Sequence, residues 1–284
     1  RGFGGQEKSK SQLKSEKFLS KIDLIAVTVG PGLEPALWTG INFAKELYKE
    51  LRIKNKKLKI IGTSHLDGHL YSNLLNSKSH ILYPSINLII SGGHTTLLLT
   101  KDLTHHKKIG ETSDDAVGEC FDKVARLLKL PYPGGPEIEK LAKCGDSVAT
   151  NFPRPMMSQK NYDFSFSGLK TSVLYYIRDN KNYKKEDVAA SFQKAAFDVL
   201  INKTLRAADE YGAKSIMISG GVSANKTLAK EFKKAIKNKK FKTPYSLLIT
   251  RYPTDNAAMI AVAGYISFLK KKNKKLVANG SLNL

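Results

Sequence analysis

Residues 215–226 read Ser215-Ile216-Met217-Ile218-Ser219-Gly220-Gly221-Val222-Ser223-Ala224-Asn225-Lys226, and this stretch decides the fold. Its β-branched and apolar residues predict a strand, its two glycines predict a tight turn, and residues 224–235 predict a helix that Ser223 or Asn225 caps. A strand that passes through Gly-Gly into a helix brings backbone N–H groups and the positive end of a helix dipole to one point. Such a turn suits a phosphate group or a nucleotide.

The same pattern occurs earlier, in the stretch Ile86-Asn87-Leu88-Ile89-Ile90-Ser91-Gly92-Gly93-His94-Thr95. A single Ser-Gly-Gly is explained by a tight turn with a positive φ angle, which glycine adopts readily. Two copies behind similar apolar strands are harder to explain as unrelated turns. We therefore predict that these two turns bind a ligand.

Length and composition describe a soluble globular protein with a large core. The chain has 284 residues, of which 41% are hydrophobic and 25% charged, and this length is more natural for two lobes than for one. The longest apolar run, residues 257–269, is too short to cross a bilayer and predicts a buried helix. No signal peptide precedes the first predicted strand, and Cys120 and Cys144 are the only cysteines. We therefore expect a protein of the reducing cytoplasm.

The net charge of +22 is carried mostly by lysine and is densest in the C-terminal third of the chain. Such a charge favours a polyanionic partner, because basic side chains neutralise phosphates and release counterions. The same net charge is also expected when lysines simply cover the solvated helix faces of a lysine-rich protein. The clustering between Lys226 and Lys275 is the reason that we favour RNA as the partner.

Hydrophobic spacing and turn residues predict the remaining elements. In chain order they are a linker at 1–21, strands at 24–29 and 59–61 around a helix at 36–51, a helix at 66–74, a hairpin at 85–100, a helix opened by a capping box at 112–115, a rigid loop at 132–136, an alternating strand at 163–171, a helix at 188–211, a strand at 245–249 and the helix at 257–269.

His65 and His69 lie four residues apart, and therefore on one face of the predicted helix. Two imidazoles so placed can share a metal ion. Pairs at this spacing are often surface or capping residues. Zinc peptidases also need Glu directly after the first histidine, where this chain has Leu66, so a metalloprotease is a poor explanation. A metal ion would need a third ligand from elsewhere in the chain.

Several other residues have a structural explanation beside a functional one. Asp122 and Lys123 lie outside the apolar stripe of their predicted helix and are explained by an ordinary solvated pair. The alternating phenylalanines at 163–171 favour a half-buried strand over stacking on RNA bases. Asp255 is explained by a helix cap alone. The two glycines of the 132–136 loop bring the backbone close either to another segment or to a ligand.

A set of longer motifs carries a resemblance to one family. The motifs are VGPGLEPALWTG, SHLDGH, LIISGGHTT, GETSDDAVGECFDKVARLL, YPGGPEIEK, FPRPM, DFSFSGLKTSV, ISGGVSANKTL and YPTDNAAMIA. They resemble, in order from about Asp23 to Tyr265, those of the tRNA N6-adenosine threonylcarbamoyltransferase (TsaD) family, once described as O-sialoglycoprotein endopeptidases. So many ordered matches are far more specific than any single motif.

The resemblance implies an α/β fold of the actin, sugar kinase and heat-shock ATPase superfamily, with two RNase H-like lobes and a nucleotide in a central cleft. The first lobe would comprise residues 1–85 and 255–284 and carry the metal histidines. The second lobe would comprise residues 86–254 and carry the Gly-rich adenylate-binding turns.

The resemblance also implies the ligands of the site. One divalent metal ion, iron (Fe²⁺) in the first place and zinc as the other choice, would be bound by His65, His69 and Asp255, so that Asp255 is both cap and ligand. The implied contacts to the adenylate are Ile89, Ile90, Ser91, Gly92, Gly93, Asp122, Gly135, Glu139 and Asn225.

The implied reaction transfers a threonylcarbamoyl group from threonylcarbamoyl-adenylate to N6 of adenosine 37 in tRNAs that read codons beginning with A. We expect positioning and Lewis-acid assistance rather than a protein nucleophile, because a metal held by two neutral imidazoles and one carboxylate stays net positive. We name no general base. The implied partners are tRNA and other proteins of the modification complex, TsaB-like and TsaE-like in a bacterium, and no membrane.

One departure and two alternatives accompany the resemblance. The family opens with a strand and a phosphate-binding turn, whereas this chain begins Arg1-Gly2-Phe3-Gly4-Gly5, which predicts an incomplete first-lobe sheet and a polypeptide that can be inactive alone. The first alternative is a non-catalytic partner subunit of the same fold, but such a subunit lacks the metal histidines. The second is a small-molecule kinase of the same superfamily, for which no acidic base is evident beside the glycine turns.

Overall fold

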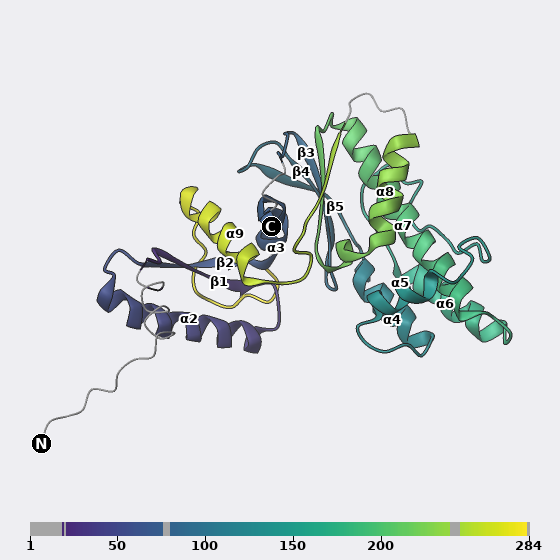
Figure 1. Ribbon diagram of the computed structural model, residues 1–284, viewed down its shortest axis with the longest axis horizontal. Coiled ribbons are helices and arrows are strands. Elements are labelled where there is room, and N and C mark those ends of the chain that lie inside the picture. The colour runs from purple at the N-terminus through teal and green to yellow at the C-terminus, as the bar shows by residue number, and fades with distance from the viewer. Residues whose placement is uncertain (1–18, 20, 76–79, 239–244, 283–284) are drawn as a thin grey trace, which may run out of the picture. The chain divides into compact units, whose positions relative to one another are not determined.

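The structure is a computed structural model that describes residues 19, 21–75, 80–238 and 245–282 (Figure 1). The chain divides into two compact units, Arg1–Gly68 with Ala257–Leu284 and His69–Asn256. The predicted linker at 1–21 falls almost wholly outside the described residues. Within the described part of the chain, no helix combines the length and the apolar character that a membrane crossing requires.

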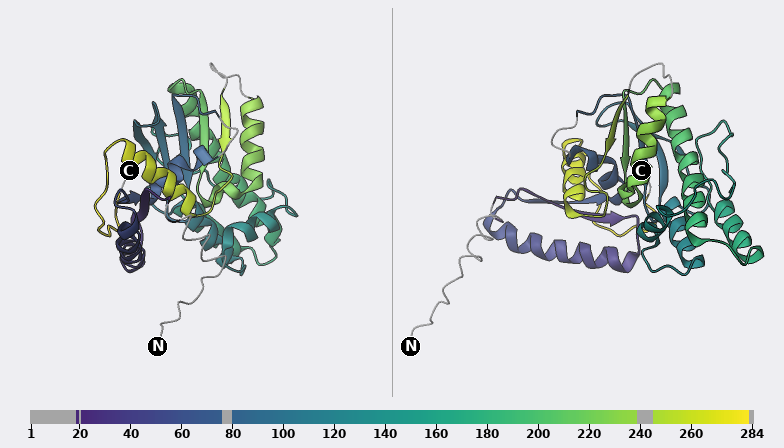
Figure 2. Two further views of the ribbon diagram at one scale, coloured as in Figure 1. Left: turned by 60° about the vertical axis from the view of Figure 1, so that its left-hand side comes forward. Right: turned by 45° about the vertical axis from the view of Figure 1, so that its right-hand side comes forward.

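The first unit is built on two parallel strands with a helix on each side. Strand β1 (Leu24–Gly30) pairs with β2 (Lys59–Ser64) through the crossover helix α2 (Glu34–Lys54). Helices α2 and α9 (Ala257–Leu269) lie on opposite faces of the pair (Figures 1 and 2). The predicted 257–269 helix is therefore confirmed, but it is buried along one face only, because Tyr265 and Leu269 stay 56% and 58% exposed.

The second unit is built on a five-stranded sheet in the order β5-β4-β3-β6-β7. Strands β3 (Ser85–Ile90), β4 (Thr95–Thr100) and β5 (His106–Glu111) pair antiparallel, which confirms the predicted hairpin. Strand β6 (Ser215–Ser219) pairs in parallel with β3 on one side and with β7 (Ser246–Ile249) on the other. Every residue of β3 and of β6 is buried, as the apolar lead-ins require.

The register of β3 and β6 places the two Ser-Gly-Gly turns together. Ser85 lies opposite Ser215 and Ile89 lies opposite Ser219, and the two strands run in the same direction. Both turns therefore leave the same edge of one sheet. Carboxyl ends of neighbouring parallel strands are the usual place for a ligand in open α/β sheets.

Helices pack on this sheet around one long buried helix. Between β2 and β7 the chain forms the helices α3 (His65–Tyr71), η1 (Ser72–Leu75), α4 (Val117–Leu127), α5 (Gly134–Ala142), α6 (Ser167–Asp179), α7 (Lys185–Glu210), η2 (Gly221–Ala224) and α8 (Lys226–Asn238). In α7 the buried residues include Phe192 and Phe197, whose ring centroids lie 4.9 and 5.8 Å from that of Phe121 on α4. This aromatic contact fixes α4 against the centre of the unit.

The predicted capping box at 112–115 is wrong. Glu111 ends strand β5, and α4 begins at Val117 behind Ala116, which makes no side-chain cap. The Val117 N–H instead donates to Thr95 Oγ1 at 2.9 Å, so strand β4 supplies the capping oxygen from far along the sequence. Thr112 donates to the Asp115 carbonyl, at 2.8 Å, and shapes the turn before the helix.

Two further predicted elements are shorter than expected or of another kind. The loop at 132–136 ends early, because helix α5 begins at Gly134. The strand at 163–171 is reduced to a single bridge between Thr112 and Phe164, and helix α6 begins at Ser167. Phenylalanines alternate with small polar residues here because Phe164 and Phe166 both pack into the core before α6 begins, and both are fully buried.

Candidate functional site

Three potential metal ligands meet beside helix α3. His65 and His69 lie one turn apart on α3, as the spacing predicts. Asp255 lies just before α9, and its Oδ1 is 3.3 Å from His69 Nε2. One ligand atom from each of the three residues lies within 4.8 Å of the others. The His69 side chain is 1% exposed and that of Asp255 is 70% exposed.

The donor set of this group fits a divalent transition metal. Two imidazole nitrogens and one carboxylate oxygen are the ligands that iron and zinc take in catalytic sites, and three protein ligands leave coordination positions open. No other group of this kind occurs within the residues that the structure describes. The histidine spacing could be found from helical periodicity, whereas Asp255 could be found only through the resemblance.

A pocket of 270 Å³ lies in the second unit, at the glycine turns. Its walls come from the β3–β4 turn, helices α4 and α5, the turn after β6 and the segment before α9. The lining residues are Gly92, Gly118, Phe121, Asp122, Pro133, Gly135, Pro136, Glu139, Gly221, Val222, Ala224, Asn225 and Thr254.

The pocket brings together five of the nine predicted adenylate contacts. They are Gly92, Asp122, Gly135, Glu139 and Asn225. Ile89 and Ile90 are fully buried in β3 and support the turn from below. Ser91 and Gly93 belong to the same turn but do not line the pocket.

Of the other lining residues, Gly221 lies in the second turn that was predicted to bind a ligand, and Pro133 and Pro136 lie in the predicted 132–136 loop, whereas Gly118, Phe121 and Thr254 were not singled out as ligand contacts. Phe121 and Pro136 directly adjoin predicted contacts, so their position beside Asp122 and Gly135 was an available signal. Thr254 had no signal of its own, because its place depends on a chain segment far from the turns.

Helices α4 and α5 are joined at the two glycines of the predicted 132–136 loop. The Gly134 N–H donates to Asp122 Oδ1 at 2.8 Å, so Asp122 is bound to the start of α5 rather than solvated beside Lys123. A Cβ on Gly134 would lie 2.4 Å from Ala125 Cβ, whereas a Cβ on Gly135 would meet nothing within 4 Å. The first glycine therefore packs on α4, and the second leaves the pocket wall open.

Asn225 begins helix α8 and lines the pocket. Its Oδ1 accepts from the Leu228 N–H at 3.0 Å, which confirms Asn225 as the cap. Its Nδ2 donates to Gln193 Oε1 at 2.9 Å, and both side chains are buried. The Lys226 N–H donates to Glu139 Oε1 at 2.9 Å, which joins α8 to α5 across the same wall.

The two glycine turns approach each other and helix α4 closely. Gly220 has a φ angle of +89°, and a Cβ there would lie 2.3 Å from the Ile90 carbonyl oxygen. A Cβ on Gly118 would lie 2.5 Å from the Ser91 carbonyl oxygen. No other residue fits these places. Gly92 and Gly221, in contrast, have nothing within 4 Å of a Cβ, so their backbone is open to a ligand.

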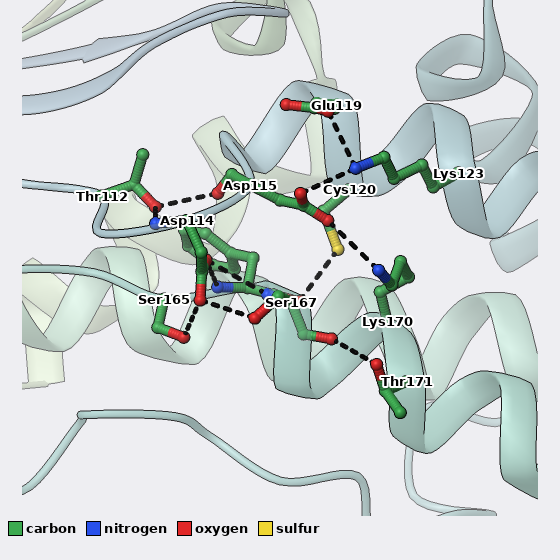
Figure 3. Close-up of polar contacts among 11 residues, drawn as sticks. Thr112, Asp114, Asp115, Glu119, Cys120, Lys123, Ser165, Ser167, Lys170 and Thr171 are labelled. Carbon is green, nitrogen blue, oxygen red and sulfur yellow. Dashed lines mark hydrogen bonds and ion pairs between the residues drawn. The ribbon is translucent and has the colours of Figure 1, made fainter.

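An ionic cluster stabilises the end of α4 that faces α6 (Figure 3). Lys123 pairs with Asp115 at 2.7 Å and with Glu119 at 2.8 Å, and Lys170 lies 3.6 Å from Asp115. Hydrogen bonds to these two carboxylates raise the pKa of Lys123. Burial raises the pKa of the neighbouring Cys120 thiol, which favours its protonated form.

Comparison with known proteins agrees with this architecture. A family model described as TsaD, tRNA N6-adenosine threonylcarbamoyltransferase, matches residues 11–262. A protein of that name from Thermosipho africanus is 49% identical over 254 residues, which is 89% of this chain and 74% of the relative. The protein of the same name from Moorella thermoacetica is 45% identical over 264 residues, covering 92% and 75%.

Solved structures show the fold. The crystal structure of HypF from T. kodakarensis matches with a TM-score of 0.63 at 15% identity, over 90% of this chain and 41% of HypF. The predicted fold class, an α/β fold of the actin-like ATPase superfamily, is confirmed. On the family model and the identity to its members, this chain belongs to the tRNA N6-adenosine threonylcarbamoyltransferase family.

Proposed function

We infer that this chain transfers a threonylcarbamoyl group from threonylcarbamoyl-adenylate to N6 of adenosine 37 in tRNAs that read codons beginning with A. One observation carries the inference beyond the family name: Thr254 lines the pocket, and the next residue, Asp255, belongs to the metal-ligand group. Consecutive Cα atoms are about 3.8 Å apart. The pocket and the metal-ligand group thus adjoin, and we propose that a bound adenylate directs its acyl phosphate end toward that group.

The reaction needs little chemistry from the protein itself. The adenosine N6 forms a bond to the carbamoyl carbon and loses a proton, and the bond from that carbon to the phosphate oxygen breaks as AMP leaves. AMP is a good leaving group, so positioning of the two reactants supplies much of the acceleration. We therefore assign no general base and no protein nucleophile.

The predicted contacts have distinct roles in holding the adenylate. Open backbone at Gly92 and Gly135 lets the phosphate and ribose come close, and Asn225 offers its amide at the start of α8. Phe121, Pro136 and Val222 form the apolar walls for the adenine ring. The first turn is held in place by its own residues Ser91 and Gly93 and by the buried Ile89 and Ile90. The carboxylates of Asp122 and Glu139 accept hydrogen bonds from the starts of α5 and α8 and hold these helices at the pocket.

His65, His69 and Asp255 would hold a divalent metal ion, and we propose iron (Fe²⁺) before zinc. When bound, the ion supplies positive charge beside the carbonyl that N6 attacks. His69 contributes a buried ligand in a fixed place, and the exposed Asp255 leaves one side of the group accessible.

The wider setting is part of the proposal. The functional lobes are residues 1–85 with 255–284 and residues 86–254, the partner proteins are TsaB-like and TsaE-like in a bacterium, and the reaction takes place in the cytoplasm. The tRNA is the acceptor substrate.

Reconstitution tests the function. The purified chain is mixed with threonylcarbamoyl-adenylate, unmodified tRNA, the partner proteins and Fe²⁺, and the tRNA is digested and searched for the modified nucleoside by mass spectrometry. The T. africanus relative serves as positive control. We expect product from the wild type, none from His69→Ala, and wild-type yield from His105→Ala, a histidine exposed in the second unit and paired with Asp102. Equal yields from all three would remove the metal site from the reaction.

A further inference from the structure

Helix α8 has two opposite faces of different chemistry. Leu228 and Phe232 are buried against the second unit. Four exposed lysines, Lys226, Lys230, Lys233 and Lys237, lie on the other side, and we call them the α8 lysine stripe. At about 100° per residue these positions fall within a sector of about 60°. The one acidic residue of the helix, Glu231, lies outside that sector.

The stripe carries a row of uncompensated positive charge. Within the part of the chain that the structure describes, no carboxylate is in an ion pair with any of these four lysines, whereas Lys123, Lys170 and Lys194 all have one. From Lys226 to Lys237 the row is about 16 Å long, because an α-helix rises about 1.5 Å per residue.

The stripe begins at the rim of the pocket. Asn225, the residue before Lys226, lines the pocket, and the Lys226 N–H donates to Glu139, which also lines it. The row therefore leads outward from the place proposed for the adenylate. The adenylate carries a single phosphate, whereas a row of this length and charge matches a chain of phosphates.

We propose that the α8 lysine stripe binds the phosphate backbone of the substrate tRNA and so brings adenosine 37 to the mouth of the pocket. This inference rests on the proposed function. Lysine is a flexible point charge, which suits contacts that position a backbone and do not read its sequence. The stripe is thus a docking surface for tRNA of any sequence, and the pocket selects the base.

The test compares two sets of four substitutions. One variant carries Lys226→Gln, Lys230→Gln, Lys233→Gln and Lys237→Gln. The control variant carries glutamine at four exposed lysines elsewhere in the second unit, Lys160, Lys181, Lys184 and Lys185. Both lose the same charge. Dissociation constants for unmodified tRNA are measured by fluorescence anisotropy at several salt concentrations, and binding of AMP checks that the pocket is intact.

We expect the stripe variant to bind tRNA more than tenfold more weakly at low salt. The slope of the logarithm of the tRNA association constant against the logarithm of the salt concentration should become less steep by about 3. Each phosphate that a lysine neutralises contributes about 0.7 to 0.9 to this slope. A tRNA with guanosine at position 37 should show the same decrease in affinity. AMP binding should stay at the wild-type value, and the control variant should bind tRNA within about twofold of the wild type.

Two results would overturn the inference. Equal weakening in both variants would mean that total charge alone attracts tRNA. Unchanged tRNA binding, together with failure to associate with the TsaB-like or TsaE-like protein, would assign the stripe to a protein interface. If the wild type binds tRNA through the stripe but gives no modified nucleoside, the result counts against the proposed function, whereas the assignment of the stripe to tRNA binding stands.

Discussion

The Leu228 N–H sets the orientation of the Asn225 side chain at the pocket, and Gln193 accepts a hydrogen bond from it in that orientation. The Leu228 N–H requires an oxygen, so Asn225 must turn Oδ1 toward it and Nδ2 toward Gln193 Oε1. Gln193 is 5% exposed in the middle of α7 and does not line the pocket. It therefore acts on a ligand only through Asn225.

The substitution Gln193→Met should raise KM for threonylcarbamoyl-adenylate about fivefold, because a neutral hydrogen bond contributes about 1 kcal/mol. Methionine keeps most of the volume but leaves the buried Asn225 Nδ2 without its acceptor, so the free energy of unfolding should fall by about 1–3 kcal/mol. Gln193→Glu keeps the acceptor and should recover part of the affinity. Steady-state kinetics with tRNA in excess measure both. A Gln193→Met enzyme with unchanged KM would show that Asn225 needs no support.

At the scale of elements, Asp114 holds the start of helix α6 (Figure 3). Its carboxylate accepts from the Phe166 and Ser167 N–H groups at 2.8 and 3.2 Å, and from the Ser165 and Ser167 hydroxyls, each at 2.6 Å. Burial raises the pKa of Asp114, but these hydrogen bonds outweigh it, and the pKa lies below its ordinary value.

Replacing Asp114 with alanine should lower the free energy of unfolding by about 1 kcal/mol at pH 7, the usual effect of removing an N-terminal cap, and asparagine should cost less. The pKa is lowered by folding, so the stabilisation is complete above the unfolded-state pKa of about 3.9 and disappears as the pH falls through the lower folded value. Urea unfolding of both variants across pH 3 to 7 measures this. A wild-type advantage that grows toward acid pH would contradict it.

Elements whose ends depend on distant side chains could not be predicted from local sequence. The start of α4 depends on Thr95, and the start of α6 depends on Asp114, so local motifs misplaced both. The fully buried Lys203 had no signal either: on α7 it donates to the Asn161 and Asp163 carbonyls at 3.1 and 2.6 Å, and burial lowers its pKa to about 8. In contrast, β1, β3, β6 and α7 follow from apolar periodicity and turn residues, and were predicted correctly.

The site could be predicted in part for the same reason. His65 and His69 are close in sequence, so helix geometry alone places them together. Asp255 and Thr254 reach the site only through the fold of the whole second unit, and a single sequence gives no measure of that proximity. The motif resemblance supplied Asp255, and nothing supplied Thr254.

At the scale of the whole molecule, alanine substitutions at two neighbouring glycines should affect different properties, the stability of the fold at Gly134 and ligand binding at Gly135. Gly134→Ala should destabilise the protein by about 1–3 kcal/mol, because its Cβ would overlap Ala125. Gly135→Ala should leave the melting temperature of the free protein near the wild-type value, because its Cβ meets nothing. The new methyl group would face the pocket, so AMP should stabilise this variant less.

Thermal unfolding with and without AMP measures both effects in one experiment. A ligand at 100 times its dissociation constant adds about 2.7 kcal/mol of stability, which is an easily measured shift. The prediction fails if Gly135→Ala keeps the full shift with AMP, or if Gly134→Ala is as stable as the wild type.

The pocket is closed by residues that stretch from Gly92 to Thr254. During synthesis, the ribosome must therefore pass Thr254 before a nucleotide has a complete place to bind. Asp255 follows at once, so the lining of the pocket and the metal-ligand group are completed by consecutive residues of the nascent chain. A product released by premature termination before this point would lack both and, under the proposed function, could not hold the activated intermediate.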